Sequence, residues 1–332
     1  MAEQKKKINW LLILQGWTML WVVIGHAFLG SPGEGPVWEN YLTYFAYSFH
    51  MPLFMLVSGW LFYCTRLKAD MTGGKNWSYA AIVKDKSMRL LLPGVVFSIL
   101  AFVLKTIFPG EMVRQTDLGL QGVLHSFLYP VDNPFQEIWF IVTLFCFFLM
   151  TPLWRFVLNK RIFIIIAFVI FLTLQFFHPK TTFLAIDRVC TYALWFFLGL
   201  FMAKTDIVEI FIKWKPWIAL VAGIIIYVVG IYGMSLFRNI GGITISFSLA
   251  ILLDQHVPQI FSSFRDYTYQ IFLMGIFAQI FIKILYRHLP ILYIVAYCLC
   301  IIVGVLVPVL VSKLIEKINW KPLSLCVGLK TK

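Results

Sequence analysis

Long apolar segments, separated by short polar stretches, follow one another along the whole chain. A helix needs about 20 predominantly apolar residues to cross the hydrocarbon core of a bilayer. By this criterion we predict ten membrane-spanning helices, at residues 9–29, 41–63, 88–108, 137–158, 162–177, 189–204, 215–233, 239–254, 266–286 and 290–315. The fifth and sixth segments are short, and only Gly233 to Arg238 separates the seventh from the eighth. The pattern indicates an all-α integral membrane protein in which residues 1–332 form a single transmembrane domain.

The composition agrees with a membrane protein and excludes an ordinary soluble domain. Of the 332 residues, 61% are hydrophobic and 13% are charged, whereas soluble domains are nearer half apolar and a quarter charged. The six cysteines lack metal-ligand spacing. We therefore interpret them as packing residues, in keeping with the usual burial of free cysteine, and predict no metal site.

The net charge of +13 is explained by membrane topology better than by nucleic acid. Cytoplasmic loops of membrane proteins carry an excess of Lys and Arg. If the N-terminus is cytoplasmic, 21 of the 28 Lys and Arg residues lie in inside segments and the other 7 lie outside. We therefore predict that both termini are cytoplasmic, and that the chain meets a lipid bilayer and not nucleic acid.

Two histidines lie in neighbouring apolar segments. His26 is near the end of the first segment, and His50 precedes Met51-Pro52 in the second. Ionisable side chains within membrane spans are costly and are functional candidates by default. In the predicted orientation both histidines lie toward the outer face. A neutral imidazole can take the proton of an alcohol that attacks a thioester, and the alternative is that each histidine only packs between helices.

Two further residues, Gln15 and Arg89, are candidates for binding a polar or anionic group. Gln15 precedes His26 by eleven residues, which places both on the same helix face, three turns apart. This face either lines a cavity or forms interhelical hydrogen bonds. Arg89 stands at the inner end of the third segment. It either follows the positive-inside rule or meets a phosphate, because its guanidinium fork matches phosphate oxygens.

More polar residues are expected at the outer face. The outer loop 109–136 leads into Glu137 and Trp139, and Arg188 lies at the outer end of the sixth segment beside Asp187. Arg188 could bind a hydroxylated or anionic substrate, or form a surface pair with Asp187. All 15 acidic residues lie in loops or near segment ends. Because proton-coupled transporters usually need a buried carboxylate relay, this distribution argues against one.

The chain resembles membrane-bound acyltransferase family 3, in particular its sugar O-acetylase-like branch. Gly25-His26 closes a stretch similar to the opening helix of the family, and Phe49-His50-Met51-Pro52 through Ser58-Gly59 is similar to its second helix. Weaker similarities occur at residues 89–93, 138–140 and 188–199. Together these stretches span most of the chain.

The resemblance implies transfer of an acyl group, usually acetyl from acetyl-CoA as co-substrate, to a hydroxyl of an extracytoplasmic glycan or lipid-linked sugar. It implies a multi-pass protein of the plasma membrane, the inner membrane in bacteria, with no permanently bound cofactor. His26 would be the catalytic histidine, and Arg89 would lie near the acyl-CoA, as would Gln15. We expect the sugar hydroxyl to react near His26, His50 and Glu137, with Trp139 and Arg188 binding the sugar.

Two departures from the family keep other functions open. Many members have arginine where this chain has Gln15, and a late histidine has no counterpart in residues 271–275. The alternatives are a transporter or flippase of glycan units and a catalytically silent membrane partner. A homo-oligomer also stays an alternative, because a surface rich in Phe and Leu serves lipid and a second copy alike.

Overall fold

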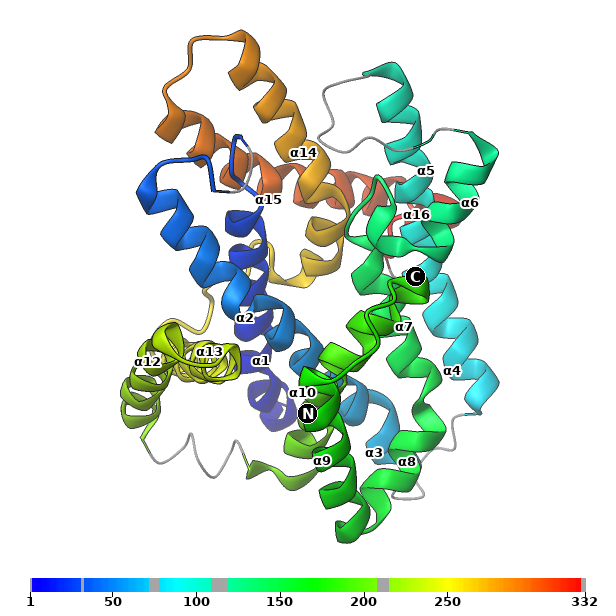
Figure 1. The fold of residues 1–332 in the computed structure, drawn as a ribbon, viewed down its shortest axis with the longest axis vertical. Helices are drawn as coiled ribbons and strands as arrows, with labels where there is room; N and C mark the ends of the chain where they lie inside the picture. Colours follow the sequence, from blue (N-terminus) through cyan, green and yellow to red (C-terminus); the bar gives the residue numbers. More distant parts are fainter. Residues whose placement is uncertain are drawn as a thin grey trace. The chain divides into compact units, whose positions relative to one another are not determined.

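The computed structural model describes residues 2–30, 33–71, 78–108, 117, 119–207 and 215–329, and every regular element in these ranges is helical (Figure 1). The α-helices are α1 (Ala2–Gly25), α2 (Val37–Phe62), α3 (Lys68–Met71), α4 (Tyr79–Lys86), α5 (Leu92–Ile107), α6 (Leu120–Leu128), α7 (Ile138–Leu149), α8 (Thr151–Asn159), α9 (Arg161–Phe176), α10 (Ile186–Thr205), α12 (Pro216–Tyr232), α13 (Ser235–His256), α14 (Thr268–His288), α15 (Tyr293–Ile318) and α16 (Lys321–Cys326). Two π-helical turns occur at Tyr63–Leu67 and Ser87–Leu91, and 3₁₀ turns at Pro130–Asp132, Phe183–Ala185 and Arg265–Tyr267. The predicted all-α fold is confirmed.

The described residues contain fewer candidate membrane spans, by length and composition, than the ten predicted. Within the described ranges, six helical segments are long and apolar enough to cross a membrane: Val37–Leu67, Tyr79–Ile107, Phe183–Thr205, Ser235–His256, Arg265–His288 and Tyr293–Ile318. The helices Asn9–Gly25, Arg161–Phe176 and Pro216–Tyr232 are apolar but shorter. Each of the ten predicted segments overlaps a helix, but the count of ten spans is not confirmed.

The predicted segment 137–158 is two helices and not one. α7 and α8 are bent by 54° relative to each other, and Pro152 lies in the first turn of α8. Proline lacks an N–H, and its ring clashes with the carbonyl four residues earlier, so it is tolerated in a first turn but not in a helix interior. Pro152 therefore accounts for the break, and the pair counts as a seventh candidate span only if both helices form one broken span.

The chain forms two compact units, residues 1–57 with 205–313 and residues 58–204 with 314–332. In the first unit α1 packs against α13 and α14, and α12 pairs with α13 along its length (Figure 1). A Cβ added to Gly241 of α13 would lie only 2.5 Å from the backbone nitrogen of Tyr227 in α12. Small residues allow such close approach of membrane helices.

The second unit has an aromatic core. Trp154 of α8 is fully buried, and its indole donates to the carbonyl of Phe147 (2.7 Å). The rings of Phe171 and Phe196 each lie with their centroids 5.6 Å from that of Trp154. Because aromatic side chains bury large areas and prefer offset or tilted contacts, this cluster fixes α7, α8, α9 and α10 against one another.

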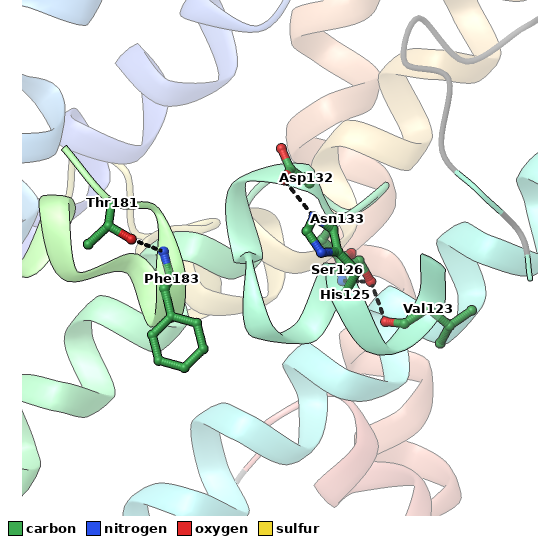
Figure 2. A network of polar contacts seen from close by, with 7 residues as sticks. All are labelled: Val123, His125, Ser126, Asp132, Asn133, Thr181 and Phe183. Atoms are coloured by element: carbon green, nitrogen blue, oxygen red, sulfur yellow. Dashed lines mark hydrogen bonds and ion pairs between the residues drawn. The ribbon is translucent and has the colours of Figure 1, made fainter. Parts of the chain in front are cut away.

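A network of polar contacts folds the segment ahead of α7 (Figure 2). Asn133 donates to Ser126 Oγ of α6 (3.4 Å), and His125 Nε2 lies 3.3 Å from Asp132 Oδ2. The sequence pattern predicted only a loop over residues 109–136, and α6 within it was not predicted. The network connects α6 to the turn that leads into α7.

Candidate functional site

His26 lies at the C-terminal end of α1, just outside the helix. The sequence predicted a helix as far as residue 29, whereas α1 ends at Gly25 and His26 stands in the turn that follows. Its N–H still donates to the carbonyl of Val22 (3.1 Å). The last carbonyls of a helix lack partners within the helix. His26 therefore belongs to a helix terminus whose carbonyls need donors from elsewhere.

Side chains of α14 and α15 supply those donors. Gln279, which is buried, donates to the carbonyl of Val23 (2.9 Å), and Lys283 donates to the carbonyl of His26 (2.9 Å). The hydroxyl of Tyr297 donates to the carbonyl of Ile24 (3.4 Å). A cation near a helix C-terminus also interacts favourably with the helix dipole. The backbone that carries His26 is thus held from two neighbouring helices.

Tyr47 of α2 lies between the two histidines. Its hydroxyl is 3.4 Å from His26 Nδ1, and the centroids of the Tyr47 and His26 rings are 5.8 Å apart. The ring of His50, one turn further along α2, has its centroid 5.1 Å from that of Tyr47. His50 is buried, and its Nδ1 bonds to the carbonyl of Ala46 (2.5 Å). The structure therefore brings the two predicted histidines to one place.

Pro52 leaves a backbone acceptor free near this place. A proline inside a helix cannot donate to the carbonyl four residues earlier, which here belongs to Ser48. Asn239 of α13, with its amide nitrogen turned toward α2, donates to this carbonyl and to that of Ser235 (3.3 Å for the latter). The hydroxyl of Ser48 also donates to Tyr227 of α12 (3.2 Å). The motif around Pro52 thus ties α2 to the α12–α13 pair.

Gln15 lies half-buried on α1. Its neighbour Trp17 donates its indole N–H to Ser246 Oγ of α13 (3.1 Å). A polar bond from α1 to α13 is thus made by Trp17. The assignment of Gln15 to the acyl-CoA stays a prediction.

A buried carboxylate near the end of α1 was not predicted. Glu39 stands in the first turn of α2 and is 1% exposed. Its Oε2 accepts a hydrogen bond from the Tyr293 hydroxyl of α15, while Oε1 has no hydrogen-bond partner in the described part of the chain. The position of Glu39 at the start of an apolar run, three residues after Pro36, was the available signal.

Trp139 and Arg188, the two predicted sugar-binding residues, lie together in the second unit. The Arg188 guanidinium carbon is 5.3 Å from the centroid of the Trp139 ring, and Tyr192 stacks on Trp139 at 5.7 Å. Asp187 Oδ2 is 3.3 Å from Arg188 Nε. Glu137 is the buried residue that precedes α7, two positions before Trp139. Arg188 therefore forms the predicted pair with Asp187 and also covers the Trp139 ring, and its binding of a substrate stays a prediction.

Arg89 belongs to a cluster of three cations around one carboxylate. Asp85 accepts from Arg89 Nε (2.9 Å) and from Arg66 Nη2 (2.8 Å). Each arginine lies in one of the two π-helical turns, and such turns are frequent at functional sites. Lys86 Nζ lies 4.1 Å from the centroid of the Phe148 ring. The cluster keeps two positive charges in excess of its carboxylate.

The predicted residues thus fall into two groups. His26, His50 and Gln15 lie in the first unit, and the other predicted residues, Glu137, Trp139, Arg188 and Arg89, lie in the second. Sequence reasoning missed Tyr47, Gln279 and Lys283. The last two are polar residues four apart in an apolar segment and so share a helix face, and this spacing was a readable signal. Tyr47 precedes His50 by three residues, but aromatic residues are common in this chain.

Comparison with known proteins agrees with an acyl-transfer chemistry. The acyltransferase domain of acyltransferase family 3 matches residues 8–313. Nodulation protein NolL of Mesorhizobium japonicum is 35% identical over 103 residues, which are 30% of this chain and 26% of that protein. The match therefore spans about a quarter of that relative's length. No solved structure matches the chain.

Proposed function

Because this chain belongs to acyltransferase family 3, we propose that it transfers acetyl from acetyl-CoA to a hydroxyl of a cell-surface or lipid-linked glycan. Acyl transfer by a multi-pass membrane protein follows from the family and from the apolar helices. The donor, the acceptor and the base are our proposals, and so is a location in the plasma membrane, the inner membrane of a bacterium.

The observation that carries the proposal is the pair of histidines that meet around Tyr47 at the end of α1. In the reaction, the sugar hydroxyl oxygen attacks the thioester carbonyl carbon while His26 takes the hydroxyl proton. The tetrahedral intermediate then collapses, the carbon–sulfur bond breaks, and the CoA sulfur leaves with that proton. General-base assistance of this kind contributes about 10²- to 10⁴-fold to a rate.

The donor and acceptor would be bound by the other predicted residues. Arg89 with Arg66 and Lys86 forms a cationic cluster that suits the phosphates of CoA, because arginine forks bind phosphate oxygens in a bidentate manner. Arg188 beside Trp139 offers an ionic and an aromatic contact for a sugar. His50 is the further polar group that we assign to the reacting centre beside His26. The assignment of Glu137 rests on the sequence alone.

The experiment is transfer of label from radioactive acetyl-CoA into glycan, in membrane vesicles that contain the protein. Wild type is compared with His26→Ala and with His256→Ala. His256 is an exposed histidine at the end of α13, in the same unit, and serves as the matched control. We expect label with wild type and His256→Ala, and a loss of about 10²-fold or more with His26→Ala.

The other results separate the alternatives. Label that persists in His26→Ala leaves an acyltransferase whose base lies elsewhere, and His50→Ala is then the next variant. No label in any sample, with the acceptor glycan present, rejects the acetyl transfer that we propose. Movement of glycan across the vesicle membrane without any acyl-CoA would favour a transporter.

A further inference from the structure

Tyr47 contacts both histidines through its ring and one of them through its hydroxyl. The distances are 3.4 Å from the hydroxyl to His26 Nδ1 and 5.1 Å between the ring centroids of Tyr47 and His50. The side chain is 47% exposed. Tyr47 is thus a half-exposed polar group beside His26.

The hydrogen-bond partners of the histidines determine which ring nitrogen is free to act as a base. A neutral imidazole has one N–H donor and one nitrogen with a lone pair. Because the Ala46 carbonyl only accepts, His50 Nδ1 must carry the hydrogen in the bond between them. Its Nε2 then keeps the lone pair. A phenolic oxygen at His26 Nδ1 has the same effect when it accepts the Nδ1 hydrogen.

The backbone contacts of His26 do not set the orientation of its ring. Gln279 and Lys283 bind carbonyl oxygens of the α1 terminus and so fix the main chain. The Tyr47 hydroxyl contacts the imidazole itself. Metal-binding histidines are positioned in the same way: a hydrogen-bond partner on one ring nitrogen fixes the tautomer and the orientation of the ring.

We propose that Tyr47 is the positioning residue of His26, and that its hydroxyl oxygen accepts Nδ1–H so that Nε2 receives the proton of the acceptor alcohol. This inference rests on the proposed function, because it assigns His26 as the base. Distances of 3.4 Å are long for a hydrogen bond, and contacts in catalytic sites commonly shorten when substrates bind. The hydroxyl is needed for the proton transfer and not for binding of the donor.

The test compares Tyr47→Phe with Tyr44→Phe, in vesicles, with two acceptors. Phenylalanine keeps the ring that packs against both histidines and removes only the hydroxyl. Tyr44 lies one turn earlier on α2, is 45% exposed, and contacts Arg238 through its ring, so it is the matched control. The acceptors are the glycan, whose hydroxyl needs a base, and hydroxylamine, which attacks thioesters without one. All rates are taken above those of vesicles that lack the protein.

We expect Tyr47→Phe to lower kcat for transfer to glycan by about tenfold or more, as a part of the general-base contribution. The KM for acetyl-CoA and the rate of transfer to hydroxylamine stay at the wild-type values. Tyr44→Phe behaves as wild type with both acceptors. His26→Ala loses transfer to glycan and keeps transfer to hydroxylamine.

Two results would overturn the positioning role. An unchanged kcat with glycan in Tyr47→Phe would show that the hydroxyl is not needed. Equal losses with glycan and with hydroxylamine would show that Tyr47 supports the fold and not the proton transfer. If wild type transfers acetyl to neither acceptor faster than vesicles without the protein do, the proposed function itself fails, and the role of Tyr47 fails with it.

Discussion

A methyl group added at Gly59 tests how closely α2 and α10 pack in the second unit. A Cβ at this position would lie 2.1 Å from the carbonyl oxygen of Phe196 and 3.3 Å from the nitrogen of Leu200. Non-bonded carbon–oxygen contacts are rarely shorter than about 3.3 Å. Because these are backbone atoms, no side-chain rotation relieves the clash, and the two helices have to move apart by roughly 1 Å.

The magnitude is a balance of two opposing effects of Gly59→Ala. Overpacking of a well-packed core costs about 1–3 kcal/mol, and a rigid backbone obstacle puts this site at the upper end. Alanine is more favourable than glycine in a helix interior by about 1 kcal/mol. Phe196, whose carbonyl is displaced, is fully buried and stacks on Phe147 with ring centroids 4.8 Å apart. We therefore expect a net loss of about 2 kcal/mol in the free energy of unfolding.

The assay is thermal unfolding of the purified protein in detergent, followed by tryptophan fluorescence. Gly30→Ala is the control, because a Cβ there meets only the end of the Glu34 side chain, at 3.8 Å. We expect a clearly lower unfolding temperature for Gly59→Ala and the wild-type value for Gly30→Ala. A Gly59→Ala protein that unfolds at or above the wild-type temperature would refute the close approach of α2 and α10.

Three further substitutions test the polar contacts. Asp85→Asn removes the carboxylate shared by Arg66 and Arg89, and we expect it to lower the free energy of unfolding by about 1–2 kcal/mol, since charge-assisted hydrogen bonds are the stronger ones. Asp132→Asn, in the exposed pair with His125, should change the free energy of unfolding by less than about 0.5 kcal/mol. Equal losses in Asp85→Asn and Asp132→Asn would contradict the expected strength of the Asp85 contacts. Gln279→Leu removes the donor to the α1 terminus, and we expect a loss of about 0.6 kcal/mol, at most about 1.7, as for other hydrogen bonds between membrane helices. An unchanged unfolding temperature would show that this bond contributes nothing.

The sequence predicted the positions of the helices better than it predicted which of them are long enough to span a membrane. Hydropathy identified the long apolar helices of the described residues, though not α6, because a long run of apolar residues is visible without knowledge of its neighbours. It gave ten spans where the described residues hold six candidates, because it counted the bent pair of α7 and α8, and shorter helices such as α9, as spans. Pro152 was readable as a break, since proline within a helical pattern ends or kinks the helix.

The candidate site was predictable only in part, because some residues that meet there lie far apart in the sequence. His26 and His50 were found because ionisable residues stand out in apolar segments. The contact of Lys283 with His26 joins residues 257 positions apart, and no local periodicity encodes such a pair. Whether the residues of the second unit act with His26, as predicted from the sequence, stays a prediction.

The end of α1 shows how a requirement of folding can also place a catalytic group. A helix that stops at Gly25 leaves carbonyls without donors, and in a bilayer no water is available to satisfy them. Gln279 and Lys283, one turn apart on α14, supply two of those donors. The same bonds hold the main chain of His26 and leave its side chain free to meet Tyr47. A polar pair that satisfies a helix terminus therefore also fixes where the proposed base stands, which is why loss of Gln279 should affect acetyl transfer as well as stability.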